Sequence, residues 1–223
     1  MAKSCEEKMK VPWKKAQIGN WRIDKFTVKK GDTEALRQGL RGRPIPTGVY
    51  TRLVRLNERG EAAGIMMSDT PAEMWDMLYA VHRATGRVLV NGLGLGVYLR
   101  AILKKKEVKH VTVVEKERDV VDLISPYFKS DLKRKRVQFI TGDAFTMQWH
   151  TGIRWNFAWH DIWEDICADN LPQMTKLHRK YGRRVDEQAS WCRAECRRLQ
   201  RESREENRIH EMWAIRRRIL KEG

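Results

Sequence analysis

A short apolar strand that runs directly into alternating glycines limits this chain to few folds. Val88-Leu-Val90 is followed by Asn91-Gly-Leu-Gly-Leu-Gly96, and residues 97–105 then show helical spacing. Glycines at alternate positions let the backbone turn sharply between a buried strand and a helix, and let a ligand approach closely. The N-terminus of the helix adds free amide groups and the positive end of its dipole. This pattern predicts an α/β fold with a ligand site at its first crossover.

Strands and helices alternate on the carboxyl side of this loop. Apolar runs at 111–114, 137–140 and 157–159 predict strands, and 118–128 predicts a helix. Such alternation is typical of a parallel sheet with right-handed crossovers. We therefore predict a Rossmann-like parallel sheet of about four strands. Beyond Glu164 the pattern predicts helix only, over 164–180 and 183–222.

The region before the loop predicts a smaller β-structure. Residues 21–28 alternate weakly, and 50–57 with 62–67 predict a β-hairpin. Thr70-Pro-Ala-Glu73 is typical of a capped helix start, and Gly86 is expected to end that helix. We expect three parts: a basic arm and β-hairpin region at 1–69, a cofactor-binding core at 70–165, and a helical extension at 166–223.

Polar residues at the ends of the predicted strands are the candidate site. Glu115 ends the second strand, nineteen residues after Gly96, where a carboxylate can accept both hydroxyls of a ribose. Asp143, followed by the apolar Ala144, suits the amino group and ring of an adenine. The fourth strand ends in His160 and Asp161, at the edge where α/β sheets place reacting groups.

In this order the four elements resemble those of class I S-adenosylmethionine-dependent methyltransferases, and the spermidine-synthase-like branch is the most similar. Val111-Thr-Val-Val-Glu115 and Gly142-Asp-Ala-Phe145 carry the likeness, which covers roughly residues 48–165. It implies S-adenosylmethionine as cofactor and S-adenosylhomocysteine as product. The implied cofactor-binding residues are Asn91, Gly92, Gly94, Gly96, Glu115, Asp143 and Ala144.

Three departures from the family pattern bear on function. Val90 stands where an acidic residue is usual, two positions before the first glycine. Trp75-Asp76 stands where aminopropyltransferases carry a His-Glu pair, which argues against a polyamine synthase. The fifth to seventh strands are not predicted, although they usually support the substrate pocket.

We expect an enzyme, a methyltransferase whose substrate the sequence does not specify. Methyl transfer needs alignment and, for some acceptors, a proton acceptor. Asp161 is the candidate base, His160 is the alternative, and Trp159 and Trp163 are candidate walls for an aromatic or cationic substrate. Two other functions stay open: a non-catalytic cofactor- or nucleic-acid-binding module on the same fold, and an aminopropyltransferase-like polyamine enzyme.

Each candidate residue also has a purely structural interpretation. The glycine loop fits a tight turn or a dinucleotide site, and Glu115 fits a solvated carboxylate at a strand end. Asp143 and Asp161 fit helix caps, and His160 fits a packed side chain. Cys192 and Cys196, one helical turn apart, fit ordinary core packing, so we predict no metal site.

The charge predicts what surrounds the site. The chain of 223 residues has 45 Lys+Arg and 29 Asp+Glu, a net charge of +16. The basic surplus lies at both ends and in the middle, whereas segment 151–179 is slightly acidic. We expect nucleic acid as a partner through the basic ends, no membrane association, and a homodimer through the C-terminal helices. Four cysteines without zinc spacing suit a reducing cytoplasm.

Overall fold

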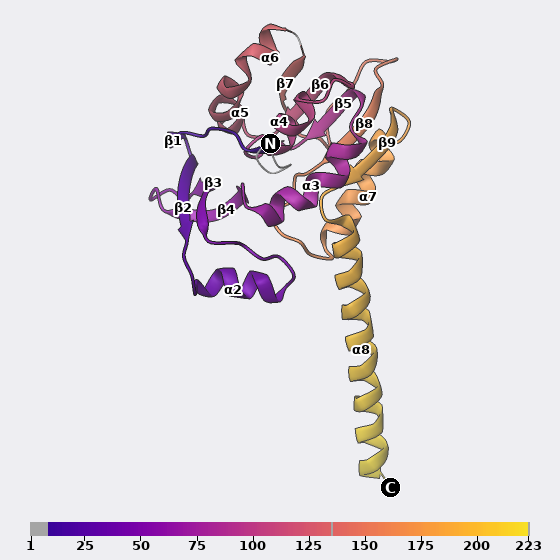
Figure 1. The fold of residues 1–223 in the computed structure, drawn as a ribbon. Coiled ribbons are helices and arrows are strands. Elements are labelled where there is room, and N and C mark those ends of the chain that lie inside the picture. Colours follow the sequence, from indigo (N-terminus) through magenta and orange to yellow (C-terminus); the bar gives the residue numbers. More distant parts are fainter. Residues whose placement is uncertain (1–8, 135, 223) are drawn as a thin grey trace.

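Two sheets of different kinds organise the molecule (Figure 1). The structure is a computed structural model that describes residues 9–134 and 136–222, the side chains of 215, 216 and 218–222 excepted. A four-stranded antiparallel sheet comes first, with strands in the order β1-β2-β3-β4. A five-stranded sheet follows in the order β7-β6-β5-β8-β9, and all its neighbouring strands are parallel.

The antiparallel sheet forms one wall beside the larger sheet. Its strands are β1 (Ala16–Ile18), β2 (Trp21–Val28), β3 (Gly48–Leu56) and β4 (Ala62–Ser68). The predicted strand 21–28 and hairpin 50–67 are thus confirmed. The helix α2 (Thr33–Leu40), which we did not predict, connects β2 to β3; Asp32 caps it by accepting from the amides of Glu34 and Ala35.

The parallel sheet has the predicted alternation of strands and helices. Its strands are β5 (Gly86–Asn91), β6 (Val108–Glu115), β7 (Val137–Thr141), β8 (Trp155–His160) and β9 (Val185–Ser190). The connecting helices are α4 (Val97–Leu103), α5 (Arg118–Ile124), the 3-10 helix η1 (Ser125–Phe128), α6 (Lys129–Lys133) and α7 (Asn170–Tyr181). The Rossmann-like fold class is confirmed.

Alternate residues of β5 belong to different hydrophobic clusters on the two faces of the sheet. Val88 and Val90 pack with side chains of α4, α5 and the helix α3 (Pro71–Arg83). Leu89 packs with Met174 and Leu177 of α7. A central strand covered by helices on both faces needs apolar residues throughout, and this is why 88–90 are continuously apolar.

The prediction of helix only beyond Glu164 is wrong at 164–169, which form no helix, and at 185–190, where β9 pairs with β8. Val185-Asp-Glu-Gln-Ala-Ser190 contains only two apolar residues, so it lacks the signal of a buried strand. It is an edge strand, where one side of the backbone meets solvent and polar side chains are tolerated. The parallel sheet therefore has five strands rather than about four.

The start of α3 also differs from the prediction. Thr70 is the N-cap residue, but its side chain forms no capping hydrogen bond. The Glu73 carboxylate instead accepts from the backbone amide of Ser68, at 2.8 Å, and from its hydroxyl, at 2.5 Å. The helix ends at Arg83, and Gly86 is the first residue of β5 rather than the helix terminator.

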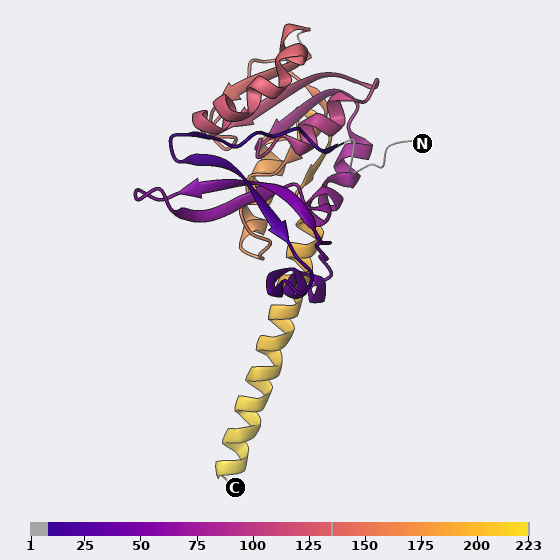
Figure 2. The ribbon, with the colours of Figure 1, turned by 60° about the vertical axis from the view of Figure 1, so that its left-hand side comes forward.

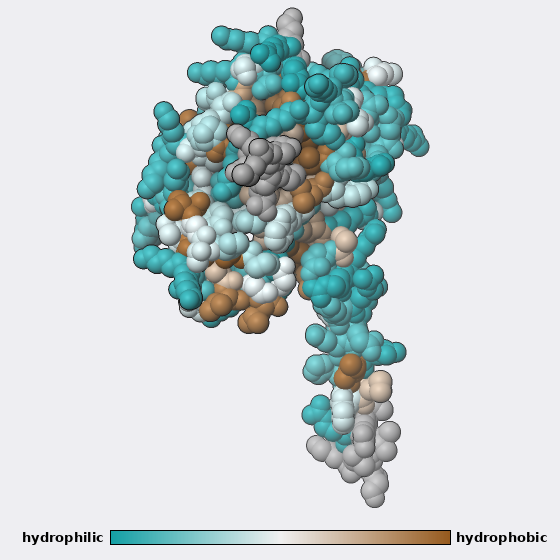
Figure 3. Space-filling view, in the orientation of Figure 1, coloured by the Kyte–Doolittle hydropathy of each residue, from teal (hydrophilic) through white to brown (hydrophobic). Residues whose placement is uncertain are grey.

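The helix α8 (Arg193–Glu222) projects away from both sheets, as Figures 1 and 2 show from two directions. Its beginning packs against α7, where Cys196 is fully buried. Further along, Ile209, Met212 and Trp213 are exposed, and Figure 3 shows apolar surface on this part of the helix. Among the described residues no helix is long and apolar enough to cross a membrane.

Candidate functional site

A cavity of about 390 Å³ lies at the carboxyl ends of the parallel strands. The segments that follow β5, β6, β7, β8 and β9 all contribute to its lining. The antiparallel sheet and α3 supply the opposite wall, including Leu53, Met67, Glu73 and Met77. Ligands of open α/β sheets bind at this edge, beside the strand where the order of connection reverses, which here is β5.

The cavity brings together most of the residues predicted from the sequence. Six of them line it: Gly92, Gly94, Glu115, Asp143, Ala144 and Asp161. The other three, Asn91, Gly96 and His160, are not among its lining residues. Of the two predicted aromatic walls, Trp163 lines the cavity, whereas Trp159 is buried and packs on Tyr98 with ring centroids 5.5 Å apart.

The glycine loop needs glycine for two physical reasons. Gly92, Gly94 and Gly96 have φ angles of +94°, +51° and +70°, which L-residues with side chains rarely adopt. A Cβ on Gly92 would lie 1.8 Å from the carbonyl oxygen of Asp161. A Cβ on Gly96 would lie 3.0 Å from the ring of Phe128. The loop is therefore packed tightly against its own protein as well as being open to the cavity.

Met67, at the end of β4, lies over the glycine loop. Its sulfur accepts a hydrogen bond from the Leu95 amide at 3.2 Å, and a Cβ on Gly94 would come within 2.5 Å of the same sulfur. The Met67 side chain also lines the cavity. The antiparallel sheet is thus joined to the loop by a thioether, which is flexible and a weak acceptor.

Glu115 joins the end of β6 to the glycine loop. Its Oε2 accepts from the Leu93 amide at 2.8 Å, and its Oε1 accepts from the Glu117 amide at 3.0 Å. Burial raises the pKa of this carboxyl, while the two amide hydrogen bonds oppose that rise. The carboxylate is therefore held in one orientation at the cavity wall.

Asp143 stabilises the turn after β7. Its Oδ1 accepts from the Phe145 amide at 2.7 Å, and its backbone carbonyl accepts from the amides of Thr146 and Met147. No helix follows Asp143 in the described residues before β8, so this residue caps a turn rather than the helix of the structural interpretation, and it also lines the cavity. The carbonyl of Ala144 accepts from the Tyr181 hydroxyl at 2.8 Å, which fixes the turn to α7.

Asp161 and Glu73 are two neighbouring carboxyls in the cavity wall. Burial raises the pKa of Asp161 to about 7, and the neighbouring Glu73 carboxylate raises it as well. Burial likewise raises the pKa of Glu73 to about 7, although its hydrogen bonds from Ser68 favour the ionised form. Both groups can therefore gain or lose a proton near neutral pH.

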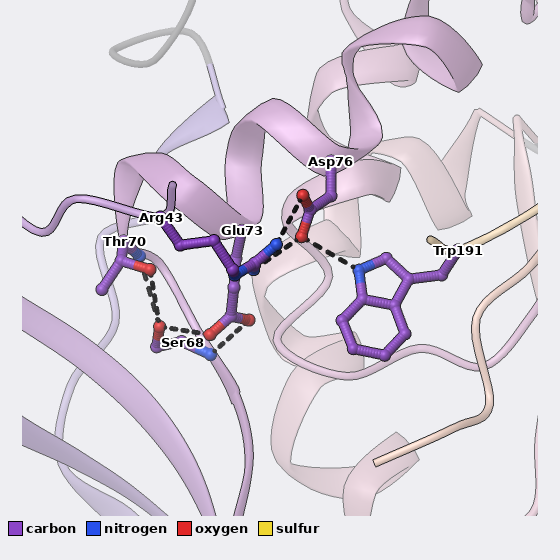
Figure 4. Close-up of polar contacts among 6 residues, drawn as sticks. All are labelled: Arg43, Ser68, Thr70, Glu73, Asp76 and Trp191. Atoms are coloured by element: carbon purple, nitrogen blue, oxygen red, sulfur yellow. Dashed lines mark hydrogen bonds and ion pairs between the residues drawn. The ribbon is translucent and has the colours of Figure 1, made fainter. Parts of the chain in front are cut away.

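Beside Glu73, an ion pair connects three distant segments (Figure 4). The Arg43 guanidinium donates to both oxygens of Asp76, at 2.8 and 2.7 Å, and the indole of Trp191 donates to Asp76 Oδ2 at 3.2 Å. Asp76 is on α3, and Trp191 directly follows β9. This network positions Trp191 in the cavity wall.

His160 lies inside the protein, next to α7. It is fully buried, with Nδ1 2.8 Å from Asn91 Nδ2 and Nε2 3.1 Å from Gln188 Oε1. Burial lowers the pKa of His160 to about 3, so the imidazole is neutral near pH 7. Asn91 is also fully buried. The two side chains connect the central strand β5 to β8 and do not reach the cavity.

The cavity is acidic although the protein is strongly basic. Among its described lining residues two are basic, Arg55 and Lys116, and six are acidic: Glu73, Glu115, Glu117, Asp143, Asp161 and Glu164. Arg55 forms an ion pair with Glu164 at 3.1 Å. An excess of carboxylates in a partly enclosed space favours a cationic ligand.

Sequence reasoning missed several residues of this wall. Glu73 carried only the signal of a capping box, and Trp191 lay inside a predicted helix. Met67 and Leu53 have the ordinary apolar pattern of a hairpin. In the structure Glu73 binds Ser68 rather than the N-cap residue Thr70. A pattern of residue types does not distinguish these two partners.

Comparison with known proteins places solved methyltransferases among the similar structures. The methyltransferase CcbJ from Streptomyces caelestis is 14% identical over 50% of this chain and 43% of its own, with a TM-score of 0.39. The Podospora anserina methyltransferase PaMTH1, solved with S-adenosylhomocysteine, is 16% identical over 49% and 46%, with a TM-score of 0.37. The cyclase SpnF is 19% identical over 51% and 41%, with a TM-score of 0.39.

The chain thus spans less than half the length of these three solved structures. With TM-scores under 0.5, they carry no argument about what this chain does. No protein-family model matches the chain, and no curated protein matches it.

The Gly92→Ala variant should have a lower free energy of unfolding than the matched variant Gly60→Ala. Gly60, in the β3–β4 turn, has φ +75°, but a Cβ there meets no atom within 4 Å, so Gly60→Ala adds only backbone strain. We expect about 1–2 kcal/mol lost for Gly60→Ala and about 2–5 kcal/mol for Gly92→Ala, measured by urea unfolding. Equal losses would show that the contact with Asp161 is relieved without cost.

Proposed function

We propose that this chain is an S-adenosylmethionine-dependent methyltransferase that uses the carboxylate-lined cavity. The observation that carries the proposal is the acidic cavity at the strand ends of a basic protein, next to a strand–glycine loop–helix unit. S-adenosylmethionine carries a sulfonium, an ammonium and a carboxylate, so it is a net cation whose charge complements this lining. The fold alone defines no chemistry, because such folds host unrelated activities.

The residues of the cavity fit the parts of this cofactor. Glu115 has its carboxylate fixed at the end of β6, where it can accept from ribose hydroxyls. Asp143 and Ala144 supply a polar and an apolar group for an adenine at the end of β7. Gly92 and Gly94 bring backbone without side chains to the cavity wall, which would suit the methionine end of the cofactor.

When bound, S-adenosylmethionine supplies a methyl group activated by its positively charged sulfur. The chain aligns the acceptor and takes up the proton that the acceptor releases. Asp161 is the proton acceptor in this proposal, since its pKa of about 7 suits proton uptake near neutral pH. Glu73 lies beside it as a second carboxyl. Trp163 and Trp191 form apolar walls for the acceptor.

The more specific likeness to the spermidine-synthase-like branch rests on the sequence motifs around Glu115 and Asp143. Where members of that branch carry a His-Glu pair, this chain has Trp75-Asp76. The Asp76 carboxylate is engaged by Arg43 and Trp191. We therefore propose methyl transfer rather than aminopropyl transfer.

Calorimetry with S-adenosylmethionine tests the cofactor site. The wild-type chain should bind it, and Glu115→Ala should weaken binding about 10- to 100-fold, the effect of losing hydrogen bonds to a charged group. Glu107→Ala is the matched control, because it removes the same charge from an exposed residue that does not line the cavity. Its affinity should stay near that of the wild type. No binding by the wild-type chain would refute the proposal.

The pH dependence of binding should distinguish S-adenosylmethionine from S-adenosylhomocysteine, which lacks the sulfonium charge. The raised pKa values of Glu73 and Asp161 mean that both are partly protonated at pH 6 and ionised at pH 8. A cation binds the ionised forms better, so affinity for S-adenosylmethionine should rise with pH, by up to about tenfold per unit below pH 7 for each proton released. Affinity for S-adenosylhomocysteine should rise less. Parallel profiles in calorimetry would contradict a sulfonium held near these carboxyls.

Transfer of a radiolabelled methyl group tests catalysis directly. The wild-type chain should label one of three pools, RNA, DNA or protein, and Asp161→Asn should reduce the rate about 10²- to 10⁴-fold, as expected for loss of a general base. Asp165→Asn, an exposed carboxyl four residues along, should keep the wild-type rate. Cofactor binding without labelling of any pool would favour the non-catalytic module.

A further inference from the structure

A basic groove between α7 and the start of α8 is separate from the cavity. Its volume is about 530 Å³, and its lining includes Lys176 and Arg179 from α7 and Arg193 and Arg197 from α8. None of its described lining residues is acidic. The two pairs of cations therefore face the same space with no carboxylate between them.

Helical spacing explains why these cations converge. Thr175, Lys176 and Arg179 lie on one face of α7, and Arg193, Arg197 and Gln200 lie on one face of α8, because residues three, four and seven apart share a face. The two helices pack together, so these faces border a common groove. The lining residues of α8 extend from 193 to 200, which is about 10 Å along the helix at a rise of 1.5 Å per residue.

The four cations have no ion-pair partner among the described side chains. Glu195, in the first turn of α8, pairs instead with Arg198. Elsewhere on α8, Arg198 and Arg208 are each bound to glutamates of the same helix. The positive charge of the groove is therefore not neutralised within the protein.

Arg193 shows the cost of this arrangement. Its Nη1 donates to His178 Nδ1 at 2.9 Å, but its buried Nε has no hydrogen-bond partner. Burial and the neighbouring Arg197 both lower the pKa of Arg193, and burial, Arg193 and Arg197 lower that of His178 to about 4. A buried guanidinium nitrogen without an acceptor is costly, and the fold tolerates that cost at Arg193.

We propose that the α7–α8 groove binds the phosphodiester backbone of a nucleic-acid strand. Phosphate oxygens accept from arginine in a bidentate manner and would satisfy the guanidinium groups of the groove. A strand has a phosphate at every nucleotide, so successive phosphates can pair with the two cations of each helix. Binding here requires neither the cofactor nor methyl transfer.

The groove leads towards the mouth of the cavity. Lys176 Nζ lies 5.4 Å from the ring centre of Phe145, and Phe145 lines the cavity. Gln173, one turn before Lys176 on α7, also lines the cavity and accepts from the Trp163 indole at 3.0 Å. A strand held in the groove would thus pass beside aromatic side chains at the cavity, on which bases can stack.

Fluorescence anisotropy of the full chain with labelled 20-nucleotide single strands, one RNA and one DNA, tests the proposal. For four phosphate contacts the slope of log K against log salt should be about −2.8 on a single strand. Arg179→Glu with Arg197→Glu, both exposed positions, should reduce that slope by about half and weaken binding at least tenfold. Comparison of the RNA and DNA arms identifies which strand is preferred.

The matched control is Arg59→Glu with Lys133→Glu, which makes the same change in net charge at exposed positions outside the groove. It should retain the wild-type slope and affinity. Three results would overturn the proposal: no binding by the wild-type chain, equal loss in the groove and control variants, or equally tight binding of poly-glutamate. The last result would indicate an acidic protein partner instead. Circular dichroism of each variant establishes that it is folded.

Discussion

The close approach of Gly92 to the backbone of Asp161 fixes the geometry at the centre of the molecule. The Asp161 amide donates to the carbonyl of Asn91 at 2.8 Å, and the Gly92 amide donates to that of Val114 at 2.9 Å. The loop after β5 is therefore held by both neighbouring strands at the point where the sheet reverses its order. Since no side chain fits at Gly92, the ends of β5 and β8 lie close enough for their segments to share one cavity.

Burial explains which strands the sequence predicts. The central strands were predictable because Val88–Val90 and Val111–Val114 are buried on both faces, so that all their residues but Thr112 are apolar. The edge strand β9 was not, because its pairing with β8 stabilises a polar segment that has no local preference for a strand. Positions at strand ends were predicted well, since topology alone brings them to one edge.

The opposite wall of the cavity was not predictable by such reasoning. Met67 and Glu73 reach the cavity because the antiparallel sheet and α3 lie against the carboxyl edge of the larger sheet. No local pattern in the sequence encodes that packing. Likewise His160 has the position of a reacting group in the sequence, but its side chain points into the protein and bonds Asn91 and Gln188. Position along a strand predicts which edge a residue occupies, and side-chain packing decides what it faces.

The charge of the protein is divided by location. The cavity gathers carboxylates, whereas the groove between α7 and α8 gathers unpaired guanidinium and ammonium groups. The net charge of +16 therefore describes neither site.

The thioether of Met67 gives the glycine loop a replaceable partner. The Leu95 amide is satisfied, at 3.2 Å, by a sulfur that accepts weakly and ends an unbranched side chain. An oxygen at this amide would exchange a weak hydrogen bond for a strong one. The loop is therefore ordered by the protein itself, through a contact weaker than the one that an oxygen would make.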